Sequence, residues 1–387
     1  MIIYKYKLYR TTKTKHLELM LGEACFVWNH ALALQKRYYR IYKGYINLYT
    51  MQKHFAKRIR RKRLHSQTTQ AILKRLDDAY KSFFRRKAKR PPKYKSSKDF
   101  PSFVLKQGGY SLNENVLTIN SIKKRYKFSL SRQYKGKIKN ITIKRNNIGE
   151  FFLIIVSDHS NTKFRKSHNG ASVGIDFGLK TYMTLSDGTC IANPLYLKKD
   201  LEELRKKSSS VSTSKKSSHN RVRKRLELCR LYKKIKNRRD NFQWELAHNL
   251  CRHFDYIFIE DLEMLGMCKM WGRKMSDLAH SDFVMKLQYL ATRYGVTVHK
   301  INRFYPSSKT CTCGFVNNQL KIHERVWTCP KCGTVHKRDL LAANNILRQG
   351  IAELDSVRKS KIANGEYLQT HLIPTISREI LCESMSN

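Results

Sequence analysis

The sequence predicts a multidomain protein in which a helical region and a β-rich region precede an α/β domain. Three observations carry this prediction. The chain has 387 residues, of which 41% are hydrophobic, so it can form two or three domains with packed cores. Its hydrophobic period changes from helical to alternating near residue 101. After residue 170 strands alternate with helices, which is typical of an α/β sheet.

The helical region begins with an apolar stripe. Its members recur at steps of three and four residues, as one face of a helix requires, and are Leu17, Leu21, Ala24, Trp28 and Ala31. Leu76, Ala79 and Phe83 repeat this spacing in a second helix. The basic tract RRKAKR follows at 85–90, and we expect Pro91-Pro92 to stop that helix because proline cannot continue one.

The β-rich region has a hydrophobic period of two. We expect strands over residues 116–119, 141–143 and 151–156, where β-branched and aromatic residues dominate. Residues 146–149, with the sequence Asn-Asn-Ile-Gly, lie between the last two strands as a hairpin turn. The pattern predicts a small β-barrel or sheet.

The α/β domain is expected to begin after Gly170. Its predicted strands cover 172–176, 182–185, 256–259 and 295–301, and a long basic helical stretch lies between the second and the third. The segment KSSSVSTSKKSSHN at 207–220 interrupts this stretch. Its low-complexity composition predicts a mobile loop.

Basic residues outnumber acidic ones along the chain. The 78 Lys and Arg face 29 Asp and Glu, which gives a formal net charge of +49. Residues 1–170 contain 41 basic and 8 acidic side chains, and the rest contains 37 and 21. So many positive charges repel one another and destabilise a compact fold, and a bound polyanion would relieve this repulsion. A nucleic acid is therefore the expected partner. For the tyrosine-rich helices of the first region, ordinary solvated faces around an aromatic core stay open as an alternative.

Neither a membrane partner nor a secreted location is indicated. No apolar run approaches the ~18–20 residues of a bilayer span, and no apolar signal region follows the basic N-terminus. The ten cysteines do not form a disulfide framework, and four of them cluster between 311 and 332. We therefore expect a cytoplasmic protein, in a reducing compartment, that contains a metal site.

Three carboxylates stand at the ends of predicted elements. Asp176 ends one strand, Glu260 ends another, and Asp339 opens a predicted helix with the sequence LLAANNIL. If they converge, a divalent cation would relieve their repulsion, and Mg²⁺ prefers carboxylate oxygens. Two such ions can activate a water and stabilise the leaving oxygen of a phosphodiester. Taken singly, each residue also fits an ordinary turn, surface or N-cap acid, and spacing alone does not choose the triple.

Two further acids lie close to these carboxylates in the sequence. Asp187 precedes Gly188, which favours a role in the turn. Asp261 follows Glu260, and successive side chains of a strand face opposite ways. Only one of Glu260 and Asp261 can therefore face a common site.

Four cysteines have the spacing of a zinc ribbon. Cys329 and Cys332, in CPKCG, form one knuckle, whereas Cys311 and Cys313, in CTCG, are one residue closer together. The sequence predicts one structural four-cysteine Zn²⁺ site, with buried free thiols or replacement of one cysteine by histidine left open. The candidate histidines are His323 and His336.

Together, three segments resemble the split RuvC-like motifs and zinc ribbon of the TnpB family. These transposon-encoded RNA-guided nucleases are related to compact type V CRISPR effectors. The segments read VGIDFGLKTYMTLSDG, FIEDLEMLGM and YPSSKTCTCG…RVWTCPKCGTVHKRDLLAANNIL. The resemblance covers residues 170–350 closely, and residues 1–169 fit in kind only. Leu341 stands where the family usually has Asn.

The resemblance implies an RNase H-like (RuvC-like) nuclease domain with an inserted zinc ribbon. Asp176, Glu260 and Asp339 match the catalytic carboxylates, which would hold two Mg²⁺ ions. In the same way, the family's four zinc-binding cysteines, which hold one Zn²⁺ in the ribbon, correspond to Cys311, Cys313, Cys329 and Cys332. The family further implies a guide RNA from the transposon end and a double-stranded DNA target beside a short flanking motif. The protein would act at the nucleoid as a monomer or dimer.

The resemblance also implies an order of domains. A first wedge strand (1–15) is followed by a helical recognition region (16–95) and a β-rich, barrel-like wedge region (96–169). The first two nuclease motifs lie within residues 170–305, which include a basic helical insert at about 195–250. The zinc ribbon (306–336), the third nuclease motif (337–350) and a tail (351–387) complete the chain.

The sequence thus predicts a Mg²⁺-dependent, RNA-guided DNA endonuclease of a transposable element. A nuclease-inactive RNA-guided repressor is one alternative, although the intact carboxylates argue against it. A transposase or accessory protein that acts directly on element ends is another, and it would need no RNA. A basic zinc-containing structural protein is the third.

Overall fold

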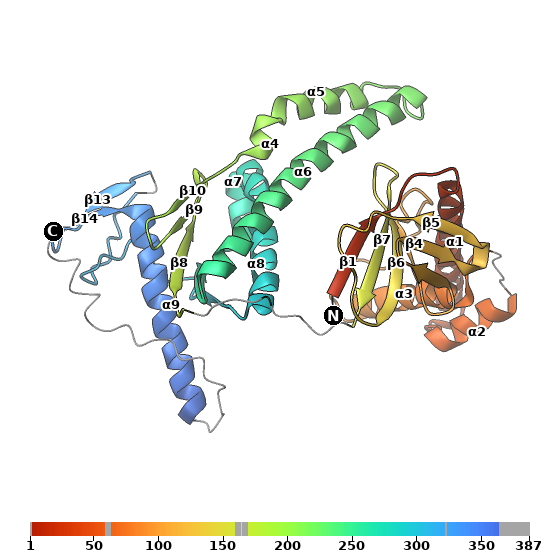
Figure 1. Cartoon of the computed structure of the whole chain (residues 1–387), viewed down its shortest axis with the longest axis horizontal. Helices are drawn as coiled ribbons and strands as arrows, with labels where there is room; N and C mark the ends of the chain where they lie inside the picture. Colours follow the sequence, from red (N-terminus) through yellow and green to blue (C-terminus); the bar gives the residue numbers. More distant parts are fainter. Residues whose placement is uncertain (1, 59–62, 159–163, 165–168, 322, 364–387) are drawn as a thin grey trace. The chain divides into compact units, whose positions relative to one another are not determined.

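The computed structural model describes residues 2–58, 63–158, 164, 169–321 and 323–363. The chain folds into two compact units, Met1–Thr162 and Lys163–Asn387, which are described separately (Figure 1). No helix among the described residues combines the length and the apolar character that a membrane span requires.

The first unit contains three long helices, α1 (Thr14–Tyr42), α2 (Leu48–Arg58) and α3 (Ser66–Phe84). The apolar stripe predicted on the first of them is buried along its whole length. It packs with residues of α2 and α3 into one hydrophobic core. The helical pattern of this region is therefore confirmed.

The second predicted helix ends earlier than expected. Helix α3 stops at Phe84, before the prolines, so the prediction that Pro91-Pro92 end it was wrong. Arg86 adopts a left-handed backbone with φ of 55°. The amides of Arg86 and Lys87 donate to the carbonyls of Phe83 and Ser82. This is the Schellman arrangement, and it ends the helix without the glycine that usually signals it.

The same unit contains two antiparallel sheets. In the four-stranded sheet the order is β1 (Ile2–Lys7), β7 (Phe151–Ser157), β6 (Ile138–Arg145) and β2 (Ser102–Leu105). The three-stranded sheet has the order β3 (Tyr110–Asn113), β4 (Val116–Ile119) and β5 (Lys124–Lys127), with a short 3₁₀ turn at Asn120–Ile122. All three strands predicted for this region are present.

The predicted hairpin turn joins β6 to β7. Arg145 pairs with Phe151 at the end of the ladder, and the Asn146 amide donates to the Glu150 carbonyl at 2.9 Å. Gly149 has a φ of 86°, a conformation that glycine adopts without steric cost. The turn prediction is confirmed.

The second unit is built on a five-stranded mixed sheet. Its order is β10 (Cys190–Ala192), β9 (Thr181–Leu185), β8 (Ser172–Phe177), β11 (Tyr256–Glu260) and β12 (Thr297–Ile301). Strands β8, β11 and β12 are parallel, and β9 and β10 complete an antiparallel meander. The predicted α/β sheet is confirmed, with one difference. Gly295 caps a helix rather than opening the last strand.

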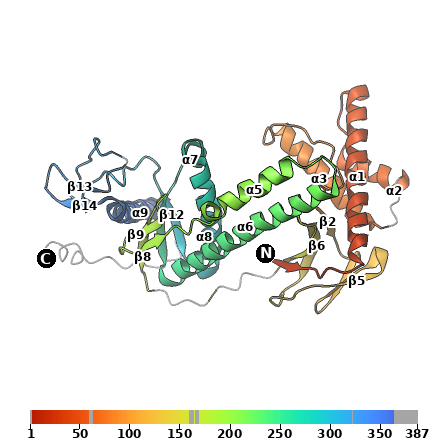
Figure 2. The ribbon, with the colours of Figure 1, turned by 90° about the horizontal axis from the view of Figure 1, so that it is seen from above.

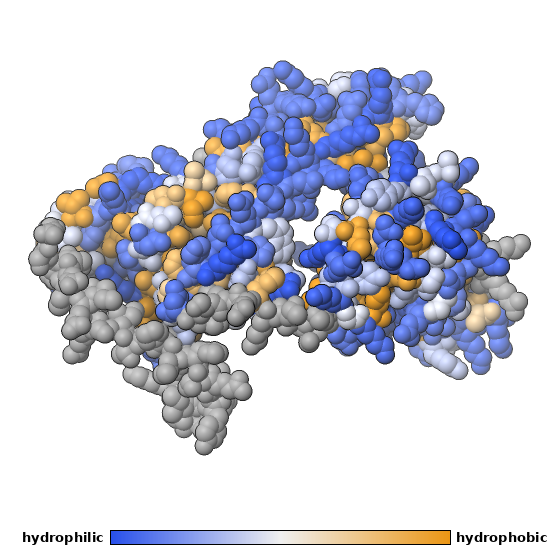
Figure 3. Space-filling view, viewed as in Figure 1, coloured by the Kyte–Doolittle hydropathy of each residue, from blue (hydrophilic) through white to orange (hydrophobic). Residues whose placement is uncertain are grey.

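A helical hairpin is inserted between β10 and β11. It consists of α4 (Tyr196–Lys199), α5 (Leu201–Ser212) and α6 (His219–His253), and α5 runs beside α6 in both views (Figures 1 and 2). The mobile loop predicted at 207–220 was wrong for much of its length, because α5 continues to Ser212. Leu204 anchors α5 against Leu231 and Ile235 of α6. Hydrophilic residues dominate the visible surface of the hairpin (Figure 3).

Three further helices cover the sheet and its edge. They are α7 (Met264–Leu278), α8 (His280–Tyr294) and α9 (Arg338–Ala363). Helices α6 and α8 pack on the face that carries Val173 and Ile175, and α9 packs on the opposite face against Phe258. Helix α9 extends well past residue 350, where no element was predicted, because Ile351 and Leu354 continue this packing. The rest of the predicted tail, residues 364–387, lies outside the described residues.

A small ribbon separates β12 from α9. Its two short strands, β13 (Val326–Thr328) and β14 (Val335–Lys337), are antiparallel. The cysteine motif CPKCG forms the turn between them. This topology places the ribbon directly before the N-terminus of α9.

Candidate active site and metal centre

Asp176 and Glu260 lie on adjacent parallel strands. The register pairs Gly174 with Phe258 and Ile175 with Ile259, so Asp176 and Glu260 follow at the same level. Because side chains alternate along a strand, both carboxylates lie on the face that carries Gly174 and Phe258. Backbones of paired strands are about 4.8 Å apart, and the two carboxylates are therefore neighbours.

Helix α9 lies closely against this face. A Cβ atom on Gly174 would lie 2.1 Å from the Ala343 backbone oxygen. A Cβ atom on Gly350 would lie 2.0 Å from the Phe258 ring. Only glycine permits this approach of helix and sheet. The packing fixes the first turn of α9, which carries Asp339, beside the strand ends.

The electrostatics of Asp176 reflect this convergence. Burial raises the pKa of Asp176 from its ordinary value of 3.8 to about 8, and the nearby charges of Glu260 and Asp339 act in the same direction. The guanidinium groups of Arg338 and Arg325 oppose this rise. Burial also raises the pKa of Glu260. Such a site favours either a proton or a cation.

Two residues that the sequence did not single out contact the carboxylates. The Ser307 hydroxyl donates a hydrogen bond of 2.5 Å to Oε1 of Glu260. Arg325 Nη1 donates to Oδ1 of Asp339 at 2.8 Å. Both lie in the motifs that carry the family resemblance, YPSSKTCTCG and RVWTCPKCG, but their spacing gave no sign of these contacts.

The three carboxylates share one neighbourhood but not one ligand shell. Among the described residues, the one set of three or more His, Cys, Asp or Glu groups whose ligand atoms all lie within 4.8 Å of one another consists of four cysteines. Mutual repulsion and the ion pair between Arg325 and Asp339 favour a wider spacing of the carboxylates. A cation would have to draw them closer.

The acids Asp261 and Asp187 behave as predicted. Asp261 binds Lys300 at 3.0 Å and also pairs with Arg303. Their hydrogen bonds lower the pKa of Asp261. Asp187 accepts a hydrogen bond of 2.8 Å from the Thr189 amide in a tight turn. Neither side chain belongs to the cluster formed by Asp176, Glu260 and Asp339.

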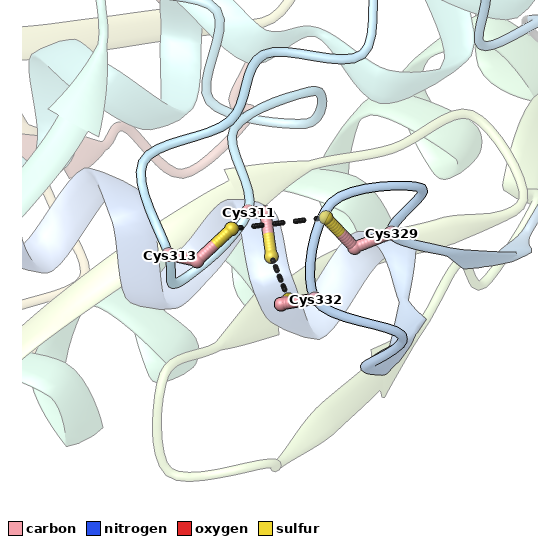
Figure 4. A group of neighbouring side chains, drawn as sticks. All are labelled: Cys311, Cys313, Cys329 and Cys332. Atoms are coloured by element: carbon pink, nitrogen blue, oxygen red, sulfur yellow. Dashed lines mark hydrogen bonds between the residues drawn. The ribbon is translucent and has the colours of Figure 1, made fainter.

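The four cysteines of the ribbon form a compact cluster. Their sulfur atoms point toward one another from two loops (Figure 4), and Cys311 Sγ lies 3.5 Å from Cys332 Sγ. Cys313 Sγ lies 3.7 Å from Cys329 Sγ. A tetrahedral Zn²⁺ with Zn–S bonds of about 2.3 Å separates its sulfurs by about 3.8 Å. The cluster therefore has the geometry of a zinc site, and the prediction of a zinc ribbon is consistent with it.

The shortened first knuckle keeps the hydrogen bonding of the second. In the second, the Gly333 amide donates to the Cys329 carbonyl at 2.9 Å. In the first, the Gly314 amide donates to the Cys311 carbonyl at 3.0 Å. Both glycines have positive φ values, 73° and 86°. The missing residue shortens the turn but leaves the sulfurs convergent.

His336 is a neighbour of this cluster. Its Nε2 lies 3.0 Å from Cys311 Sγ, and the ring is buried. The set of ligand atoms that lie close to one another consists of the four cysteine sulfurs and does not include His336. His323 is exposed.

The surroundings of the cysteines shift their pKa values. Burial raises the pKa of Cys311, and hydrogen bonding to Thr334 lowers the pKa of Cys332 to about 6. Leu341 packs in the apolar cluster of the ribbon.

Family models match two segments of the chain. The OrfB_IS605 model, described as "Probable transposase", matches residues 155–270. The model "Cas12f1-like, TNB domain" matches residues 280–346. The first match contains Asp176 and Glu260, and the second contains Asp339 and the four cysteines.

Relatives match most of the chain. It is 33% identical over 289 residues to the "Putative RNA-guided DNA endonuclease" of Streptomyces pristinaespiralis, covering 73% of this chain and 71% of that protein. It is 26% identical over 356 residues to the "Putative RNA-guided DNA endonuclease InsQ" of Escherichia coli K12, covering 86% and 88%.

Two solved structures share the fold. One is the Cas12f1 protein of the "Cas12f1-sgRNA-target DNA complex", with a TM-score of 0.55 and 16% identity over 87% of this chain and 83% of that chain. The other is the "mini-RNA-guided endonuclease CRISPR-Cas_phi3", with a TM-score of 0.55 and 10% identity over 90% and 92%. By its sequence relatives, this chain belongs to the OrfB_IS605 family of TnpB proteins and carries a Cas12f1-like TNB domain.

Proposed function

We propose that this chain is an RNA-guided DNA endonuclease whose Asp176, Glu260 and Asp339 hold Mg²⁺ for the hydrolysis of phosphodiesters. The observation that carries the proposal is the convergence of the three carboxylates. Two come from aligned parallel strands and the third from the helix packed on them. Together with the family relationship, this arrangement favours nuclease chemistry over simple binding.

The donor set fits magnesium. All three side chains offer hard oxygen ligands, which Mg²⁺ prefers. Burial and the neighbouring carboxylates raise the pKa of Asp176, so a bound cation would stabilise its ionised form. When bound, two Mg²⁺ ions supply an activated water and stabilise the leaving oxygen of a phosphodiester. The strands and α9 bring the three carboxylates into one neighbourhood, and a bound cation would draw them closer.

Two arginines stand beside these carboxylates. Arg325 is paired with Asp339, and Arg338 adjoins it in sequence at the start of α9. Their charges reach Asp176. Guanidinium groups bind phosphate oxygens with two parallel hydrogen bonds. We assign to these arginines the orientation of the DNA backbone at the cleavage site.

A guide RNA and its DNA target are the proposed partners. Residues 24–76 contain thirteen Lys and Arg and lack Asp and Glu. Within this stretch Tyr39, Tyr42 and Tyr49 are 60%, 67% and 74% exposed. Exposed aromatic rings among basic groups suit nucleic acids, because bases stack on the rings and phosphates bind the cations.

The four cysteines are proposed to hold one structural Zn²⁺. Four thiolates close the coordination sphere of zinc, so such a site stabilises a fold rather than performing chemistry. The ribbon lies between Glu260 and Asp339 in the sequence. We therefore expect zinc to order the path of the chain between these two carboxylates.

The central test is cleavage by a single carboxylate variant. The protein is purified with its bound RNA, the RNA is sequenced, and matching DNA is offered with Mg²⁺. Asp176→Asn should abolish cleavage and leave RNA and DNA binding nearly intact. Asp261→Asn is the matched control, since Asp261 adjoins Glu260 but pairs with Lys300 and Arg303, and it should cut normally.

The same experiment separates the alternatives. DNA binding without Mg²⁺-dependent cleavage by the wild type would favour an RNA-guided repressor. Cleavage that persists after the RNA is digested would favour a transposase that acts directly on element ends. Cleavage by Asp176→Asn at the rate of the wild type would contradict the assignment of the carboxylates.

A further inference from the structure

The turn between β12 and the first zinc knuckle is held by hydrogen bonds from two side chains, Ser307 and Asn345. The Ser307 hydroxyl donates to Glu260 Oε1 at 2.5 Å. Asn345 Nδ2 donates to the carbonyls of Ser307, at 2.8 Å, and Thr310, at 2.6 Å. Ser307 is 6% exposed and Asn345 is 1% exposed. The Ser307 and Asn345 side chains are therefore largely shielded from water.

These hydrogen bonds connect the turn to two other parts of the site, the zinc ribbon and helix α9. Thr310 directly precedes Cys311, the first cysteine of the ribbon. Asn345 lies on α9, less than two turns after Asp339. One buried amide thus joins the ribbon, the helix that carries Asp339 and the serine that contacts Glu260.

We propose that Ser307 is a positioning residue for Glu260, and that Asn345 links its placement to the ordering of the zinc ribbon. The inference rests on the proposed function, because it assigns Glu260 to a cation site. Loss of ribbon order would then weaken cation binding at a carboxylate that is not part of the ribbon.

The physical reason lies in the charge and length of the glutamate. Glu260 stands beside Asp176, and repulsion between ionised carboxylates favours rotamers that separate them. A glutamate has three side-chain torsions, so fixing it costs conformational entropy. The Ser307 hydroxyl satisfies one lone pair of Oε1 and leaves the other lone pairs for a cation. The hydroxyl can thus hold the carboxylate in place while leaving its remaining lone pairs free to bind a cation.

The turn itself is built to keep Ser307 in place. The Lys309 amide and the Thr310 hydroxyl both donate to the Pro306 carbonyl, at 3.0 and 2.8 Å. With Asn345 bound to the two carbonyls, the segment 306–310 has little freedom to move. These bonds hold the backbone of Ser307, so its hydroxyl leaves Glu260 only if its side chain rotates or if this turn or α9 shifts.

The test measures Mn²⁺ affinity by the electron paramagnetic resonance signal of the free ion. The sample is the full chain stripped of nucleic acid in high salt, because phosphates also bind Mn²⁺. Ser307→Ala should weaken the binding of Mn²⁺ about tenfold, as removal of an outer-shell partner commonly does. Ser307→Thr keeps the hydroxyl and should restore affinity to within about twofold of the wild type.

Two controls separate positioning from general stability. Ser218 caps α6 by accepting a hydrogen bond from the Arg221 amide, and Ser218→Ala should lower the melting temperature but leave Mn²⁺ affinity unchanged. If Ser307→Ala lowers only the melting temperature, or if Ser307→Thr fails to restore affinity, the proposal is overturned.

A double-mutant cycle tests the link to the ribbon. Cys313→Ser should weaken Mn²⁺ binding in the wild type but have much less effect when combined with Ser307→Ala, since coupled sites are not additive. Fully additive effects would overturn the coupling. Asp176→Asn distinguishes the two proposals. If it leaves Mn²⁺ binding intact, the carboxylate site itself is wrong, whereas loss in Asp176→Asn without loss in Ser307→Ala rejects only the positioning role.

Discussion

Glu260 and Asp176 stand at the same level of two adjacent parallel strands, one residue beyond the paired positions Ile259 and Ile175. Strand β11 lies beside β8 in space but is separated from it in sequence by a meander and a helical hairpin. The register is what makes the two carboxylates neighbours. It is also consistent with the different surroundings of Asp261, one residue further along the chain, which pairs with Lys300 and Arg303.

The raised pKa of Asp176 predicts a specific dependence of stability on pH. In the folded protein Asp176 keeps its proton up to a pH of about 8, but in the unfolded chain it loses it near 3.8. Between these values the folded state binds more protons, so the free energy of unfolding of the Mg²⁺-free protein should fall as pH rises. Thermal melts between about pH 5 and pH 8, without chelator so that zinc is kept, would measure this slope.

Asp176→Asn is the matched variant for that slope. It cannot ionise, so it should melt at a higher temperature than the wild type near pH 8 and show a flatter dependence on pH. Added Mg²⁺ should raise the melting temperature of the wild type more than that of the variant. A pH dependence that is identical in both proteins would refute the assignment.

Replacement of zinc-cluster cysteines should act on folding rather than on chemistry. Cys329→Ser with Cys332→Ser should lower bound zinc and folded yield more than the specific activity of the protein that does fold, because a four-thiolate site is structural. Cys190 is exposed and outside the cluster, so Cys190→Ser should retain wild-type yield. Zinc content by elemental analysis checks both, and unchanged zinc in the double variant would contradict the structural site.

Gly174 should tolerate no larger side chain. In Gly174→Ala the new methyl group meets the backbone of Ala343 and Leu347 at 2.1 and 2.6 Å, so α9 must move away from β8. We expect a loss of at least about 2 kcal/mol of unfolding free energy, together with loss of cleavage as Asp339 shifts.

Gly22 provides the contrast for that substitution. It lies inside α1 with open space around its Cα, and nothing within 4 Å of an added Cβ. Gly22→Ala should therefore stabilise the protein by about 0.5–1 kcal/mol. Denaturant titration measures both variants, and equal effects at the two positions would argue against the close packing of α9.

The exposed tyrosines near the end of α1 and the start of α2 should contribute to nucleic-acid affinity without contributing charge. Replacing Tyr39, Tyr42 and Tyr49 together by alanine should weaken binding to single-stranded RNA or DNA by about tenfold or more, since stacking contributes about 1–3 kcal/mol per base. The slope of log affinity against log salt should stay unchanged, because that slope counts phosphate contacts.

Exposed basic residues near the end of α1 should give the opposite signature. Lys36→Gln with Arg40→Gln should reduce the salt slope by about two. Fluorescence anisotropy with RNA and DNA oligonucleotides at several salt concentrations separates the two effects. An unchanged affinity in the tyrosine variant would leave these rings as ordinary surface residues.

The local sequence pattern was sufficient to predict elements with strong periodicity. It was insufficient where contacts between distant residues determine the structure. The stripe on α1 and the hairpin at 146–149 follow from spacing and turn chemistry alone. The end of α3 does not, because Arg86 supplies a left-handed conformation that glycine usually marks. The serine-rich part of α5 continues a helix that packs against α6 through Leu204, and composition does not reveal this contact.

The sequence by itself determined which chemical groups the protein has and which family it resembles: the carboxylates at strand and helix ends, the four cysteines and the large positive charge. The tertiary structure alone decided which of these groups meet. The alignment of β8 with β11, the approach of α9 to Gly174 and the contact of Ser307 with Glu260 join residues far apart in the chain. Such contacts depend on packing and register summed over whole elements, which no local spacing encodes.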